Sequence, residues 1–433
     1  MAARIYYADL WGLRGDWPNP QQGTKYYALA ESDIASTDWC ELQPNSPFYF
    51  FVPRNEDFRA EYELGWKVTE IFPTNCVGLF TARDALAIQR SPEEVENTIH
   101  KFVALSAEEA RNQYELGNDV RDWKVSLAQK DIIDTKLDSK KIVRISYRPF
   151  DNRYTYYTGH SRGFHCRPRG KVMHHMLTTR NLGLITNRQI MTGTINHIFI
   201  TNNIMDLHVI ETAHASAYLF PLYLYPAESE MQFEKGIRRP NLNADFIRRF
   251  SEKLGLEFIE AGKGDLEEKF GPEDIFNYAY AVLHSPAYRS RYAEFLKIDF
   301  PRLPLTSDRE LFKALVTKGA ELVSIHLMES VMLARPITRY PVTGSNHVEK
   351  VRYDEANQRV YINKNQYFEG VSSDIWDFHI GGYQVCHKWL KDRKGRTLSY
   401  DELTHYQRII VALKETICLM QEIDALIPSW PIE

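Results

Sequence analysis

The chain has 433 residues, enough for two or three domains, and its 44% hydrophobic and 25% charged residues are ordinary for a globular protein. A formal net charge of −4 excludes a polycation, so an anionic partner must be held by a local concentration of basic residues. Five widely spaced cysteines without a CxxC pair argue against a disulfide framework or zinc site and favour a reducing cytoplasm.

The first 80 residues predict a short α/β piece. Residues 3–13, 47–54 and 66–73 are short aromatic or apolar runs ended by Gly or Pro, which is typical of strands. No basic region followed by an apolar run opens the chain, and no apolar stretch approaches the roughly 20 residues of a membrane span. We therefore expect neither a signal peptide nor a membrane-bound protein.

Residues 81–140 predict a helical connector. Ser91 is followed by proline and two acids, a pattern that starts a helix, and "SAEEAR" from Ser106 repeats the capping signal. The polar stretch from 118 to 140 continues this helical pattern.

The remaining chain, residues 141–400, predicts a β-rich domain with helical insertions. Short β-branched and aromatic runs separated by Gly and Asn fill residues 141–226, and apolar spacing of i, i+3, i+4 indicates helices over 241–332. Residues 348–396 read as hairpins, including an apolar strand with a basic end at 378–396. A final helix covers 401–433. The fold class is thus α+β, with a β-rich central domain flanked by helical segments.

One stretch concentrates positive charge. Residues 140–190 contain eleven lysines and arginines but a single acid, Asp151. Arginine dominates, and its planar fork suits phosphate oxygens and the guanine edge. Interleaved aromatic residues, including Tyr156 and Tyr157, are able to stack on bases or to hydrogen-bond phosphates.

The stretch divides into two parts. "YRPFDNR" also fits a structural role, because Asp151 lies between Arg148 and Arg153 in sequence and is able to hold both. "GHSRGFHCRPRGK", residues 159–171, has no acid to answer its charge, which predicts a flexible loop that grips an anion.

Two further signals are weaker. "KWLKDRKGR", residues 388–396, is a second basic cluster after a Gly-Gly pair, and a solvated hairpin tip is the competing interpretation. "TNRQ", residues 186–189, places Asn, Arg and Gln side by side, the residue types that read adenine and guanine edges.

Catalytic patterns are absent or incomplete. The P-loop, GxGxxG and HExxH patterns do not occur. "GHSRG" matches a nucleophile elbow literally around Ser161, but a basic loop with Pro168 follows where a helix is required. His174 and His175 lack partners at metal-ligand spacing, and His326 on an apolar helix is expected in the core.

Several of these stretches resemble one family. "YRPFDNRYTYYTG", "CRPRGKVMHHM", "FPLYLYP", "EDIFNYAYAVLHSPAYRSRYAEFLKIDFPRLPL" and "IGGYQVCHKWLKDRKGR" are similar to the C-terminal specificity region of Type ISP restriction-modification enzymes. In that family one polypeptide joins nuclease, motor, adenine methyltransferase and target recognition. The resemblance implies that residues 1–80 are the trailing part of a methyltransferase-like lobe and that residues 141–400 are the target-recognition domain.

The chain departs from the family in its catalytic motifs. Neither the Gly-containing S-adenosylmethionine motif nor the (N/D)PP(Y/F) motif, which holds the flipped adenine, occurs here. We therefore expect a DNA target-recognition module without its own catalysis or cofactor. S-adenosylmethionine would belong to a missing methyltransferase domain, and a methyltransferase or restriction subunit is a possible partner. An enzyme with an unrecognised site and a protein-interaction module are the alternatives.

The residues predicted to contact double-stranded DNA are basic, aromatic or amide side chains of these clusters: Arg148, Arg153, Tyr156, Tyr157, Arg162, Arg167, Arg169, Lys171, His174, Asn187, Arg188, Gln189, Lys388, Lys391, Arg393, Lys394 and Arg396.

Overall fold

The computed structural model describes residues 3–15, 18–19, 21–46, 49–177, 181–190, 195–211, 215–226 and 238–433. The chain divides into two compact units, Met1–Phe58 and Arg59–Glu433. Within the described residues no helix is long and apolar enough to cross a membrane. The predicted subdivision at residues 80, 140 and 400 lies inside the second unit and stays a prediction.

The first unit is built on one small antiparallel pair. Strand β1 (Ile5–Tyr7) pairs with β2 (Cys40–Leu42), and helix α1 (Lys25–Glu31) lies between them in sequence. The strand predicted over 3–13 is therefore much shorter than expected. The strand predicted over 47–54 is not found in residues 49–54, and its first two residues lie outside the described residues.

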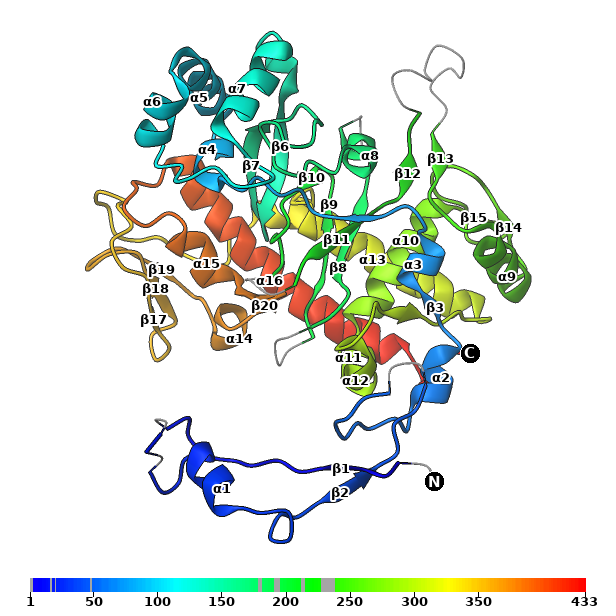
Figure 1. Cartoon of the computed structure of the whole chain (residues 1–433). Coiled ribbons are helices and arrows are strands. Elements are labelled where there is room, and N and C mark those ends of the chain that lie inside the picture. The colour runs from blue at the N-terminus through cyan, green and yellow to red at the C-terminus, as the bar shows by residue number, and fades with distance from the viewer. Residues whose placement is uncertain are drawn as a thin grey trace. The chain divides into compact units, whose positions relative to one another are not determined.

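Helices occur where the capping signals of residues 81–140 predict them. Helix α5 (Pro92–Ala104) begins after Ser91, whose side chain accepts from the Glu94 backbone N–H. Helix α6 (Ala107–Gln113) begins after Ser106 with a reciprocal capping box. Helix α7 (Val125–Asp134) completes the group (Figure 1).

Two four-stranded sheets form the β-rich part of the second unit (Figure 1). In the first, β6 (Ile142–Arg148) and β7 (Asp151–Tyr156) form an antiparallel hairpin with an irregularity between Ser146 and Arg148. The full order adds β10 (Ile204–Met205) beside β6, in parallel, and β5 (Ile88–Gln89) beside β7. The hairpin places the "YRPFDNR" part of the basic stretch on the two central strands of this sheet.

The second sheet has the order β4-β11-β8-β9. Its strands are β4 (Cys76–Val77), β11 (Ala217–Pro221), β8 (Gly183–Asn187) and β9 (Ile198–Thr201), and each neighbouring pair is antiparallel. Every residue of β8 and β9 is buried, which explains their continuous apolar and β-branched sequences. The short β12 (Tyr223–Leu224) and β13 (Arg239–Pro240) pair beside them.

A helical core lies between these sheets and the C-terminal part. Helix α10 (Pro272–His284) is buried over almost its whole length, and α13 (Arg309–His326) and α16 (Tyr400–Leu426) pack on it. The buried ring of His326 receives a hydrogen bond from Tyr280 Oη at 2.6 Å and contacts Thr416 Oγ1 at 2.8 Å, so its predicted core position is confirmed.

Further short elements surround this core. They are α9 (Ala244–Leu254), α11 (Pro286–Arg291), α12 (Ala293–Leu296), the pair β14 (Glu257–Phe258) and β15 (Lys269–Phe270), and the pair β3 (Trp66–Lys67) and β16 (Arg302–Leu303). The strand predicted over 66–73 ends at Lys67, because Val68–Ile71 form helix α3 with a capping box from Glu70.

The C-terminal hairpins are confirmed in part. Strands β17 (Arg352–Asp354), β18 (Arg359–Tyr361) and β19 (Tyr367–Glu369) form an antiparallel sheet. The strand predicted over 378–396 is wrong: a hairpin of β20 (His379–Ile380) and β21 (Tyr383–Gln384) leads directly into helix α15 (Val385–Lys391). The fold as a whole is α+β, as the sequence predicts.

Candidate nucleic-acid interface

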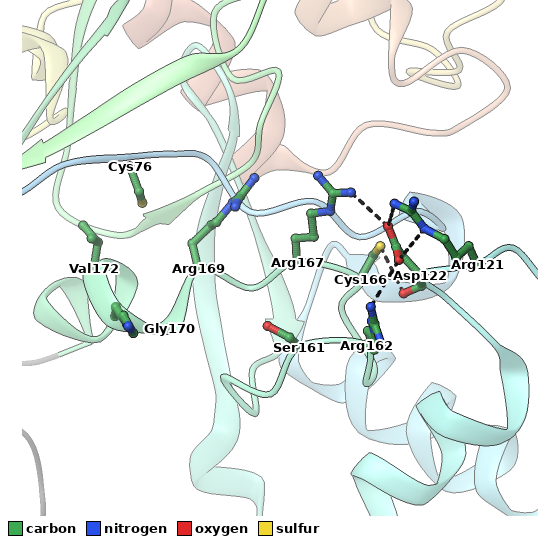
Figure 2. A pocket seen from close by; sticks show the side chains of 11 residues that line it. Cys76, Arg121, Asp122, Ser161, Arg162, Cys166, Arg167, Arg169, Gly170 and Val172 are labelled. Carbon is green, nitrogen blue, oxygen red and sulfur yellow. Dashed lines mark hydrogen bonds and ion pairs between the residues drawn. The ribbon is translucent and has the colours of Figure 1, made fainter.

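A basic groove of about 680 Å³ opens beside the loop that the sequence singles out. We call it the basic groove and define it by its lining residues: Cys76, Arg121, Asp122, Ser161, Arg162, Cys166, Arg167, Arg169, Gly170, Lys171 and Val172. Four of these are arginines, one is a lysine and one is an acid (Figure 2). The groove therefore presents positive charge to whatever enters it.

The loop that lines the groove is held by internal hydrogen bonds, in contrast to the flexible loop that we expected. The carboxylate of Asp131 accepts from the Thr158 hydroxyl at 2.8 Å and from the Phe164 backbone N–H at 2.8 Å. Tyr157 Oη donates to the Pro168 carbonyl at 2.9 Å, and the backbones of Arg167 and Phe80 exchange two hydrogen bonds. These contacts fix where the basic side chains emerge.

Asp122 neutralises part of the positive charge of this loop, although it is distant from the loop in sequence. Arg121 donates to it from Nε at 3.0 Å and Nη2 at 2.7 Å, and Arg167 donates from Nη2 at 2.9 Å. Arg162 Nη2 lies 3.7 Å away. The hydrogen bonds from Arg121 and Arg167 hold the pKa of Asp122 far below its usual range. The expectation that no acid meets this loop is therefore wrong in three dimensions.

The end of the groove is formed around a short turn. Arg169 has φ of 59°, a left-handed conformation, and its buried Nε has no hydrogen-bond partner among the described residues. Lys171 is exposed. The His174 ring contacts the Gly170 carbonyl through Nδ1 at 2.9 Å, so this half-buried residue helps to close the turn.

The "YRPFDNR" hairpin is held largely within the protein. Arg148 is buried and donates from Nη1 to Asp206 at 2.7 Å. Arg153 donates to Asp151 from Nη2 at 2.8 Å. Asp151 thus holds Arg153 but not Arg148, which corrects the prediction that it holds both.

The second partner of Asp151 comes from the other basic cluster. Arg393 donates from Nη2 to Asp151 Oδ1 at 3.0 Å, and its guanidinium lies 3.4 Å from the centroid of the Trp389 ring. Burial would raise the pKa of Asp151, but the charges of Arg393 and Arg153 hold it well below its usual range. This buried triad joins β7 to the turn after α15.

The two predicted tyrosines are also internal. Tyr156 is fully buried, and its hydroxyl lies 2.7 Å from the Thr135 hydroxyl. Tyr157 is 5% exposed and bound to Pro168. Neither ring is available for stacking on a base in this structure, because each is covered by the protein interior.

The "TNRQ" stretch separates into two buried and two exposed residues. Asn187 is 2% exposed, and its Nδ2 donates to Glu211 Oε2 at 3.4 Å, so it does not reach the surface. Arg188 and Gln189 follow at the exposed end of β8. Arg188 Nε lies 3.4 Å from Asp299, a surface ion pair of small energetic weight.

The second basic cluster mixes internal pairs with free surface charge. Lys388 contacts Asp392 at 2.6 Å, and Arg396 contacts Glu402 at 3.2 Å, whereas Lys391 and Lys394 are exposed. With Arg393 buried, only part of this cluster faces solvent.

Sequence reasoning missed two groove residues, Arg121 and Asp122. They lie on the segment before α7, far in sequence from the basic stretch, and a single Arg-Asp pair carries no distinguishing local pattern. The match of "GHSRG" to a nucleophile elbow is not confirmed locally, because turns follow Ser161 where the elbow needs a helix.

Comparison with known proteins identifies the family. The family model described as the Type ISP C-terminal specificity domain matches residues 70–422. No curated protein sequence matches.

Three solved structures share the fold at low sequence identity. A nuclease-deletion mutant of the Type ISP restriction-modification enzyme LlaGI, in complex with a DNA substrate mimic, is 19% identical with a TM-score of 0.64, covering 94% of this chain and 38% of that one. The ATP-dependent Type ISP enzyme LlaBIII bound to DNA is 17% identical with a TM-score of 0.67, covering 99% and 28%. A DrdV–DNA complex is 17% identical with a TM-score of 0.65, covering 94% and 42%. The chain thus spans less than half the length of each.

Proposed function

Because the chain belongs to the family of Type ISP C-terminal specificity domains, we propose that it recognises a target sequence in double-stranded DNA. Three structural neighbours of the same fold are themselves described in complex with DNA or a DNA mimic. The observation on this chain that carries the proposal is the basic groove, whose lining has four arginines and a lysine but a single carboxylate.

The groove supplies contacts to the phosphate backbone. The side chains of Arg162 and Arg167 are 66% and 49% exposed, so both are able to reach a strand that passes over the loop. Such contacts set register and affinity without reading sequence. The internal hydrogen bonds of the loop favour this role, because guanidiniums that emerge from a fixed backbone lose less freedom on binding.

Base reading needs exposed donors and acceptors elsewhere. Of the predicted "TNRQ" residues, Arg188 and Gln189 meet that condition and Asn187 does not. Lys391 and Lys394 offer a second set of backbone contacts. We assign Arg188 and Gln189 to base edges, since Arg and Gln pair naturally with guanine and adenine in the major groove.

Methyl transfer belongs outside this chain. The S-adenosylmethionine and (N/D)PP(Y/F) motifs are missing from the sequence. The basic groove also does not fit the cofactor, because S-adenosylmethionine carries a positive sulfonium that four arginines and a lysine repel. We therefore propose that adenine-N6 methylation is performed by a separate subunit or domain in the cytoplasm, with this chain providing specificity.

Binding of fluorescent duplexes tests the proposal. We expect the full chain to bind random-sequence duplex DNA with an affinity that falls steeply as salt rises, and to select one sequence from a randomised pool. Absence of duplex binding at low salt contradicts the proposal. Transfer of labelled methyl groups from S-adenosylmethionine by the chain alone contradicts the assignment of catalysis to another subunit.

A further inference from the structure

Three guanidiniums converge on one carboxylate inside the basic groove. Figure 2 shows Arg121, Arg162 and Arg167 directed at Asp122. The three arginine side chains are 83%, 66% and 49% exposed, whereas the Asp122 side chain is 18% exposed. The acid is therefore more deeply placed than the bases that surround it.

This arrangement has the donor chemistry of a phosphate site. A carboxylate and a phosphodiester each carry one negative charge on two oxygens that accept the paired N–H groups of a guanidinium. Around Asp122, however, three positive charges share one negative charge. This excess of positive charge allows a phosphate to compete with the carboxylate for the same guanidiniums.

We propose that Arg121, Arg162 and Arg167 form the seat of one DNA phosphodiester, and that Asp122 occupies this seat in the free chain as an internal competitor. The inference rests on the proposed function and specifies how the groove is controlled. When DNA binds, the exposed guanidiniums turn from the carboxylate to the phosphate by side-chain rotation, with the loop backbone unchanged.

Competition of this kind acts equally on every DNA sequence. Any phosphate that enters the seat must displace the same carboxylate, so backbone affinity is lowered without regard to sequence. The ratio of specific to non-specific affinity is unchanged, but base contacts then make up a larger share of the total binding free energy, because the uniform term is smaller.

A competing role and a positioning role of Asp122 predict opposite changes in DNA affinity when the residue's charge is removed. If Asp122 serves to hold the arginines ready for DNA, its removal weakens binding; if it competes, its removal strengthens binding. The residue itself is anchored independently of its charge, because the Cys166 thiol donates to the Asp122 backbone carbonyl at 3.3 Å. Asp122→Asn therefore removes the charge and keeps the shape and the anchor.

The test measures binding of the full chain to a random-sequence duplex across a salt series. We expect Asp122→Asn to bind about three- to tenfold more tightly, with a log–log salt slope close to that of wild type, because the same phosphate occupies the seat in both complexes. Adding Arg162→Ala to that variant should weaken binding again and make the slope shallower, because one guanidinium of the seat is lost.

Asp134→Asn is the matched control, because Asp134 is an exposed acid paired with Lys130 on α7 and lies outside the groove. It should leave the affinity for the duplex unchanged. Unchanged or weaker binding by a folded Asp122→Asn overturns the inference while the proposed function stands, provided that wild-type chain binds DNA. If the wild-type chain does not bind DNA, both the inference and the proposed function are contradicted. If the thermal melt of Asp122→Asn differs from that of wild type, Asp122→Ser is tested in its place. If both variants are unfolded, Asp122 has a structural role and the inference is overturned.

Discussion

The guanidinium of Arg393 donates to the carboxylate of Asp151 at 3.0 Å, across 242 residues of sequence. Two basic stretches that looked like separate DNA-facing clusters therefore meet at one buried acid. Their contact joins strand β7 to the turn after α15, and part of the charge that the sequence displays is used to hold the protein together.

Removing Arg393 should destabilise the protein rather than weaken a DNA contact directly. The two side chains are 8% and 2% exposed, and loss of one partner of such a buried pair typically costs about 3–5 kcal/mol. We expect Arg393→Ala to lower the free energy of unfolding by about that amount in urea titrations. Lys394→Ala changes the neighbouring exposed residue and should stay within about 0.5 kcal/mol of wild type. Equal stability of the two variants contradicts a structural role for Arg393.

The sequence predicts local secondary structure better than it predicts which charged residues pair. Helices α5 and α6 follow from capping residues that act within one turn of themselves, at Ser91 and Ser106. The partners of Asp151 and the approach of Asp122 to Arg167 depend on how distant segments pack, and no local pattern records this. For the same reason, the sequence alone does not distinguish whether the tyrosines of "YTYY" lie on a solvated surface or in the core.

Lowering the pH should destabilise the folded chain, because it contains histidines that are buried in their neutral form. Burial lowers the pKa of His326 to about 3 from an ordinary value of 6.5. Between these values the unfolded chain binds a proton that the folded chain refuses, so stability falls as the pH is lowered through this window.

The size of this effect is measurable at mild pH. His326 should contribute a loss of about 2 kcal/mol in the free energy of unfolding between about pH 7 and about pH 5. His165, with a burial-lowered pKa of about 4, adds in the same direction. Urea titrations at about pH 7 and about pH 5 should show the loss, and His326→Gln should reduce it. Asp151 does not interfere, because its pKa is lowered and its contribution is lost only in stronger acid.

The groove arginine and lysine should act on all DNA sequences alike. Arg167→Ala and Lys171→Ala each remove one exposed positive charge from the groove lining, so we expect weaker binding and a salt slope shallower by about 0.9 for each. Sequence preference in a randomised pool should not change. Lys130→Ala on α7 removes a charge outside the groove and is the control. If Arg167→Ala binds DNA as wild type does, the loop does not lie on the duplex.

Substitutions of Asn187 and Gln189 should have different effects, although only Arg188 lies between them in sequence. Asn187 is buried beside Glu211, and removing its amide leaves that carboxylate with one hydrogen bond fewer, at a cost of about 1–3 kcal/mol in unfolding free energy. Gln189 is exposed at the end of β8, so Gln189→Ala should leave stability unchanged.

Selection from randomised duplexes then separates the two roles. Gln189→Ala should relax preference at a single base position by about 1–3 kcal/mol and leave the salt slope as in wild type, because no phosphate contact is lost. Asn187→Ala should bind in proportion to its folded fraction, with the wild-type preference intact. A changed base preference in the stable, folded fraction of Asn187→Ala contradicts its buried position in β8, and an unchanged preference in Gln189→Ala removes it from the base-reading residues.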